Sequence, residues 1–128
     1  LEAAAASLFP RGRPHANFVN AAFAYARPRE ANRFSPAGRG AWYAALEVET
    51  ALAEVGFHLT RALRDAGRFE AAIDWAELWA SVAGEYVDLR GIDPRPACLD
   101  PDPALGYPAG NALAEEARAA GLNGIVWP

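Results

Sequence analysis

Residues 32–58 constrain the fold of this chain more than any other stretch of it. Residues 35–40 contain one proline and two glycines, which favour a turn. The apolar and aromatic residues 41–46 then predict a buried strand. Residues 50–66 predict a helix, because Leu52, Val55, Leu59 and Leu63 recur at helical spacing and Gly67 is placed to end it. A turn, a strand and a helix are thus predicted within 27 residues.

The rest of the chain also alternates between predicted strands, helices and loops. Residues 2–9 predict an alanine-rich helix, and residues 111–120 predict another that ends at Gly121. Strands are predicted at residues 18–25, 86–89 and 124–127, and the five prolines of residues 92–108 predict a loop. Residues 69–84 fit two patterns, so both stay open. Trp75, Leu78, Trp79 and Val82 fit a helix, whereas Ile73, Trp75 and Trp79 fit the alternation of a strand.

Composition limits the classes of function. A chain of 128 residues with 52% hydrophobic residues suffices for one domain with a core. The net charge of −4 argues against direct nucleic-acid binding, which needs a basic surface. No apolar run reaches the roughly 18 residues that span a bilayer, so no membrane association is expected. Cys98 is the single cysteine and forms no intrachain disulfide, which favours a cytoplasmic location.

The two ends of the chain suggest a portion of a longer protein. The sequence contains no methionine and stops at Pro128, directly after an apolar run. We therefore expect residues 1–128 to form a single domain that is incomplete at both ends.

Two titratable residues share one face of the predicted helix. Glu54 and His58 are four residues apart, which is the spacing of neighbours on a helix surface. One interpretation is a carboxylate in a cleft, coupled to an imidazole. The alternative is an ordinary surface pair of little consequence.

The arginine and tyrosine side chains around the turn also allow both a functional and a structural interpretation. Arg33 and Arg39 flank the turn, and arginine suits bidentate recognition of phosphate, although a solvated arginine is the more common case. Trp42 and Tyr43 are adjacent in the predicted strand and would point to opposite faces, one toward a ligand ring and the other into the core. For each of them taken alone, core packing is the favoured interpretation.

Other kinds of site are excluded by the sequence. His15, His58 and Cys98 show no spacing typical of metal ligands, so no metal is predicted. Neither a phosphate-binding loop motif nor a Gly-x-Gly-x-x-Gly motif is present. Chemistry would therefore rest on arginine, tyrosine, glutamate and histidine side chains.

Two blocks of residues carry a family resemblance. The first reads Arg33-Phe34-Ser35-Pro36, then Gly40-Ala41-Trp42-Tyr43-Ala44-Ala45, then Glu49-Thr50-Ala51-Leu52-Ala53-Glu54, with Phe57-His58. The second reads Tyr107-Pro108-Ala109-Gly110-Asn111-Ala112-Leu113-Ala114, then Ala119-Ala120-Gly121-Leu122-Asn123-Gly124-Ile125-Val126-Trp127-Pro128. Their order and spacing resemble the RES domain family, the toxin half of RES–Xre toxin–antitoxin modules.

The resemblance implies a fold and an activity. The fold would be a mixed α/β domain similar to ADP-ribosyltransferases, with a small central sheet flanked by helices. The activity would be cleavage of NAD+ at the nicotinamide–ribose bond, by phosphorolysis or ADP-ribosyl transfer, as in glycosyltransferases of the EC 2.4.2 type. NAD+ would be the substrate, inorganic phosphate a co-substrate, and no cofactor is expected. The expected partner is an Xre-like helix-turn-helix antitoxin. A homodimer is a further prediction, which no local feature supports.

The resemblance also assigns residues. Arg33 and Glu54 would be the catalytic pair, and Arg33, Tyr43, Arg27 and Asn111 would bind NAD+. The helical spacing adds His58 as a residue that would support Glu54. The chain departs from the family at three positions: Asn111 replaces the usual glutamine, Pro108 stands where some members carry serine, and the family's serine is expected directly after Pro128. These departures motivate a second hypothesis, a catalytically inactive RES-fold module that binds other proteins.

Overall fold

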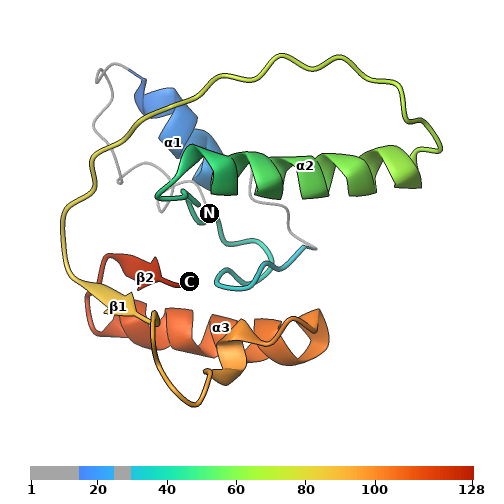
Figure 1. The fold of residues 1–128 in the computed structure, drawn as a ribbon. Coiled ribbons are helices and arrows are strands. Elements are labelled where there is room, and N and C mark those ends of the chain that lie inside the picture. Colours follow the sequence, from blue (N-terminus) through green and yellow to red (C-terminus); the bar gives the residue numbers. More distant parts are fainter. Residues whose placement is uncertain (1–14, 25–29) are drawn as a thin grey trace. The chain divides into compact units, whose positions relative to one another are not determined.

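The computed structural model describes residues 15–24 and 30–128. They belong to two compact units, one made of the residues up to Trp42 together with Val82–Pro128, the other of Tyr43–Ser81. The elements are α1 (Ala16–Ala24), α2 (Val48–Asp65), β1 (Tyr86–Asp88), a 3₁₀ helix (Ala97–Leu99), α3 (Pro103–Ala119) and β2 (Gly124–Val126) (Figure 1). Helices beside a small parallel sheet confirm the mixed α/β class. The likeness to ADP-ribosyltransferases and the single domain over residues 1–128 stay predictions.

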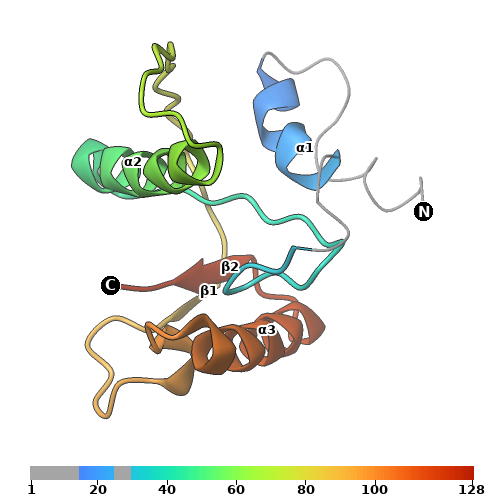
Figure 2. The ribbon, with the colours of Figure 1, turned by 90° about the vertical axis from the view of Figure 1, so that its right-hand side faces the viewer.

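A strand–helix–strand unit organises the carboxyl-terminal half. The two strands pair in parallel, with Tyr86 opposite Gly124, Val87 opposite Ile125 and Asp88 opposite Val126. Parallel strands need a crossover connection, and α3 supplies it, lying along one side of the strand pair (Figure 2). Aromatic and β-branched residues favour this pleated conformation. The predicted strands at residues 86–89 and 124–127 are therefore confirmed to within one residue at their ends.

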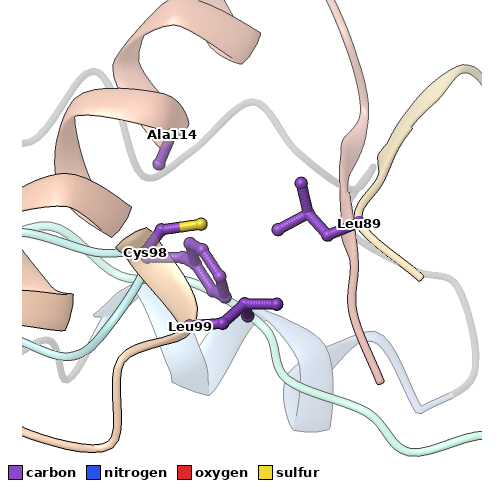
Figure 3. Close-up of a cluster of buried hydrophobic side chains, with 5 residues drawn as sticks. Leu89, Cys98, Leu99 and Ala114 are labelled. Carbon is purple, nitrogen blue, oxygen red and sulfur yellow. The ribbon is translucent and has the colours of Figure 1, made fainter. Parts of the chain in front are cut away.

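The core of this unit joins four segments that are distant in the sequence. Its buried side chains are Phe34, Leu89, Cys98, Leu99 and Ala114, four of which are labelled in Figure 3. The Phe34 ring also packs on Trp127, with ring centroids 4.9 Å apart. Each buried large apolar side chain contributes roughly 1.5–3 kcal/mol. This packing attaches the turn at residues 32–35 to α3 and to the end of β2.

Helix α3 begins earlier than the sequence pattern indicated. The predicted loop at residues 92–108 is wrong from Pro103 onward, because α3 runs from Pro103 to Ala119. Asp102 is the N-cap, and its carboxylate accepts a hydrogen bond from the Ala104 N–H at 2.9 Å. A proline at the first helical position costs nothing, since its missing N–H would have no partner there. Pro103 was therefore interpreted as part of a loop, although it occupies the first position of a capped helix.

Helix α2 agrees with its prediction. It spans Val48–Asp65, against residues 50–66 expected, and Gly67 follows it with φ 66°. The N–H of Gly67 donates to the Arg64 carbonyl and the N–H of Arg68 to the Leu63 carbonyl, both at 3.0 Å. These two bonds satisfy carbonyls that have no partner within the helix, and the positive φ suits glycine. Gly121 ends α3 in the same way, as predicted.

The strand predicted at residues 18–25 is wrong where the structure describes it. Residues 16–24 form helix α1, of which four of nine residues are alanine, the strongest helix former. Val19 is its single β-branched residue, so the apolar run lacks the composition of a strand. Tyr25 and the helix predicted at residues 2–9 lie outside the described residues.

Two further segments of the described chain form no regular element. Residues 41–46 were expected to form a strand, yet they pair with no neighbouring strand and remain irregular, so that prediction is wrong. Residues 69–83 adopt neither the helix nor the strand that their pattern allows. Their large side chains are exposed, Trp75 by 60% and Trp79 by 82%, so no packing stabilises either form.

Among the described residues, no helix combines the length and the apolar character that crossing a bilayer requires.

Candidate functional site

A groove of about 500 Å³ in the unit formed by Tyr43–Ser81 gathers three of the residues singled out from the sequence. Tyr43, Glu54 and His58 line it. The remaining lining is apolar: Ala44, Ala45, Ala51, Val55, Leu59, Ala62, Ile73 and Trp75. One glutamate, one histidine and one tyrosine thus line an otherwise apolar groove, which is the general character of a small-molecule site.

Helix α2 places the two titratable groups of this groove. Glu54 and His58 are separated by about one helical turn, and Val55 and Leu59 extend the same lining along the helix. Both Glu54 and His58 are exposed. The His58 ring contacts the Phe57 ring edge to face, with centroids 5.5 Å apart. The groove therefore presents a solvated carboxylate beside an imidazole whose position the neighbouring ring restricts.

Arg33 belongs to the other unit and is held tightly there. Its Nη1 donates to the carbonyl oxygens of Cys98 and Asp100, each at 2.7 Å. Its guanidinium carbon lies 5.6 Å from the centroid of the Tyr107 ring, within the range of a cation–π contact. The side chain is thus half-buried and oriented by three groups distant in the sequence.

Small residues on helix α3 allow the backbone at Arg33 to lie close to this helix. Its buried face consists of small residues, namely Gly106, Gly110, Ala114 and Ala117. A Cβ atom at Gly110 would collide with the Arg33 carbonyl oxygen, and one at Gly106 would crowd the Arg33 Nη1. The small face of α3 is therefore required for the position of Arg33.

Asn111 lies on the same helix and touches the same turn. Its Nδ2 donates to the Asn32 carbonyl oxygen at 3.2 Å. Its Oδ1 is buried and has no hydrogen-bond partner among the described residues. The structure thus brings Asn111 and Arg33 together in one unit, and Tyr43, Glu54 and His58 together in the other. Arg27 lies outside the described residues.

Arg39, the other arginine of the turn, forms an ion pair. Its Nη1 donates to Glu115 Oε1 at 2.6 Å, and Arg118 donates to the same oxygen at 2.9 Å. The hydrogen bond from Arg39 is the main reason that the pKa of Glu115 lies below its ordinary value. Of the two arginines that flank the turn, Arg39 is therefore engaged with a surface carboxylate of α3.

Sequence reasoning missed three contributors to these clusters. Trp75 and Ile73 line the groove, but residues 69–83 form no strand, so their alternation was no reliable signal for this position. Tyr107 faces the Arg33 guanidinium, although it was quoted only as part of a motif. No local pattern connects Tyr107 with Arg33, because long-range packing brings them together.

The family comparison covers nearly the whole chain. A model of the RES domain matches residues 9–128. No curated protein and no solved structure matches the chain. The matched region contains both the groove of Tyr43, Glu54 and His58 and the cluster around Arg33. The chain belongs to the RES domain family.

Proposed function

We propose that this protein cleaves NAD+ at the nicotinamide–ribose bond and acts as the toxin of a bacterial toxin–antitoxin pair. One observation carries the proposal: in a RES domain chain, Glu54 and Tyr43 line the same groove. An apolar groove with one carboxylate suits a substrate that combines a flat ring with a ribose.

Glu54 is the proposed catalytic carboxylate. When the bond between nicotinamide and ribose breaks, its electron pair leaves with the nicotinamide nitrogen, and positive charge develops on the anomeric carbon. A carboxylate beside that carbon stabilises the charge in the transition state. Nicotinamide departs as a neutral molecule, so no general acid is needed to protonate it. His58, one turn away on α2, would orient Glu54.

The other assigned residues would hold the substrate. Tyr43 would pack on the nicotinamide ring or its ribose. Arg33 would bind the pyrophosphate, because its hydrogen bonds to the described residues all come from Nη1. Asn111 and Arg27 complete the proposed NAD+ contacts.

The acceptor of the ADP-ribosyl group is inorganic phosphate, water or a protein side chain. Any of these reactions consumes NAD+, and its depletion would arrest growth. An Xre-like helix-turn-helix protein is the proposed antitoxin, which would cover the site. The acidic net charge of −4 fits a division of labour in which that partner contacts DNA.

The direct test is to incubate the full-length protein with NAD+, with and without inorganic phosphate, and to identify the products. Free nicotinamide is expected under at least one condition, and ADP-ribose 1-phosphate would identify phosphate as the acceptor. Unchanged NAD+ under both conditions would refute the hydrolase and phosphorylase readings.

Glu54→Gln tests the assigned chemistry. The amide keeps the shape of the side chain but removes its charge, so we expect kcat to fall about 10²–10³-fold, as when other electrostatic stabilisers are removed. Glu49→Gln is the matched control, because Glu49 lies roughly 140° around the same helix and does not line the groove. Full activity of Glu54→Gln would remove Glu54 from the mechanism.

One observation favours the alternative of a non-catalytic interaction module. Residues 69–82 expose Trp75, Trp79 and Val82 by 60%, 82% and 63%, a degree of apolar exposure typical of binding surfaces. The two functions differ in the cell. Normal growth and a normal NAD+ content during overexpression of the full-length protein would favour the module over the enzyme.

A further inference from the structure

Among the described residues, the Arg33 guanidinium donates hydrogen bonds from one of its three nitrogens. Nη1 carries two N–H groups, and it donates to two carbonyl oxygens, those of Cys98 and Asp100. Among the described residues, the hydrogen bonds of this side chain all come from Nη1. The opposite edge, formed by Nε and Nη2, is therefore left for a ligand.

Both hydrogen bonds hold Nη1, so the far edge of the guanidinium can still tilt by small angles within the broad geometry that carbonyl acceptors allow. The Tyr107 ring lies 5.6 Å from the guanidinium carbon and restricts that tilt through its π face. Tyr107 is half-buried, and α3 places it one residue after Gly106, whose missing side chain makes room for Nη1. The Tyr107 ring, the two carbonyl oxygens and the small residues of α3 together fix the position and the plane of the guanidinium.

We propose that Tyr107 is a positioning residue for Arg33, which it holds so that Nε and Nη2 face the phosphate oxygens of NAD+ as one bidentate edge. Bidentate recognition depends on the plane of the guanidinium, because two parallel N–H groups must meet two oxygens. This proposal rests on the function proposed above, and it adds a residue that contacts Arg33 rather than the substrate.

The kinetic test compares Tyr107→Leu with Tyr107→Phe. Leucine removes the π face, whereas phenylalanine keeps it and loses only the hydroxyl. For Tyr107→Leu we expect KM for NAD+ to rise about two- to five-fold, the worth of an exposed cation–π contact, with kcat unchanged within about two-fold. Phenylalanine is expected to restore the wild-type KM. Equal effects of both variants would overturn the proposal, because the hydroxyl rather than the ring would then matter.

A spectroscopic test keeps the positioning role separate from NAD+ turnover. In ¹⁵N–¹H spectra of the full-length protein, the Arg33 Nε–Hε signal is assigned by its loss in Arg33→Lys. We expect it to show an aromatic ring-current shift in the wild type and in Tyr107→Phe, and to move on titration with inorganic pyrophosphate. In Tyr107→Leu the ring-current shift should disappear and pyrophosphate should bind about two- to five-fold more weakly.

The outcomes are distinguishable. A wild-type protein that leaves NAD+ intact refutes the proposed function, while the spectrum and the pyrophosphate titration still decide the role of Tyr107. An Arg33 signal without a ring-current shift overturns the proposal, and the wild-type spectrum decides this even where Tyr107→Leu fails to fold. Unaltered pyrophosphate binding by a folded Tyr107→Leu variant also overturns it.

Discussion

At the scale of single residues, the charged groups at the end of β1 act locally. Asp88 at the end of β1 accepts hydrogen bonds from the Arg90 Nε at 2.9 Å and Nη2 at 2.6 Å, and from the Arg90 backbone N–H at 3.0 Å. These bonds, led by those of the guanidinium, lower the pKa of Asp88 to about 2. Arg33 is different, because its partners lie 65 and 67 residues away in the sequence.

Removal of the Arg90 guanidinium should therefore raise the pKa of Asp88. In Arg90→Gln we expect this pKa to move from about 2 toward 3.8 without reaching it, because the backbone hydrogen bond remains. A pKa depressed by folding stabilises the native state above the unfolded value and loses that effect as pH falls through about 2. The measurement is an NMR pH titration of the Asp88 carboxyl, with Arg118→Gln as the control that leaves it unchanged. An equal titration curve in Arg90→Gln would contradict the assignment.

At the scale of elements, α2 and α3 differ in the packing around a glycine within the helix. Gly56 lies within α2, and a Cβ atom there would meet nothing within 4 Å. Gly110 lies within α3, where a Cβ atom would collide with the Arg33 carbonyl. The same residue type is thus a local weakness in one helix and a packing requirement in the other.

The substitution of alanine for each glycine should have opposite effects on stability. Gly56→Ala is expected to stabilise the protein by about 0.5–1 kcal/mol, because alanine is the better helix former and the site is open. Gly110→Ala should destabilise it by roughly 1–3 kcal/mol through overpacking. Urea unfolding followed by circular dichroism measures both, each variant serving as the other's control. An unchanged midpoint for Gly110→Ala would show that α3 and the turn are less closely packed than described.

At the scale of the whole molecule, order is distributed unevenly. The strand–helix–strand unit has a buried core, two paired strands and capped helix ends. Residues 69–83 have no regular backbone hydrogen bonding among the described residues, and their large side chains are exposed. Protection of backbone amides depends on such hydrogen bonds and on burial.

Hydrogen exchange should reproduce this difference. In the full-length protein, amides of β1, β2 and α3 are expected to exchange slowly, because their backbone hydrogen bonds lie beside the core. Residues 69–83 are expected to exchange within seconds, close to the rate of an unfolded peptide. The measurement is exchange followed by mass spectrometry of overlapping peptides. Slow exchange in residues 69–83 would instead identify one of the two elements that their apolar pattern allows.

Part of the fold and of the candidate site was accessible from the sequence. Helix α2, its glycine end, β1, β2 and the family itself follow from short-range patterns and motif spacing. The spacing of Glu54 and His58 also placed them correctly on one helix face. Apolar periodicity gave the wrong prediction for three segments. Alanine content made α1 a helix, and the N-cap Asp102 started α3 early. Residues 41–46 are irregular because no strand pairs with them.

The sequence by itself determined the family, the glycine ends of α2 and α3 and the residue types available for chemistry, because these depend on interactions within a few residues of one another. Only the tertiary structure decided what surrounds Arg33: two carbonyl oxygens, the Tyr107 ring and the small face of α3. Contacts over such separations arise when apolar surfaces such as those of Phe34 and Leu89 are buried together, and burial depends on the whole fold rather than on any local pattern.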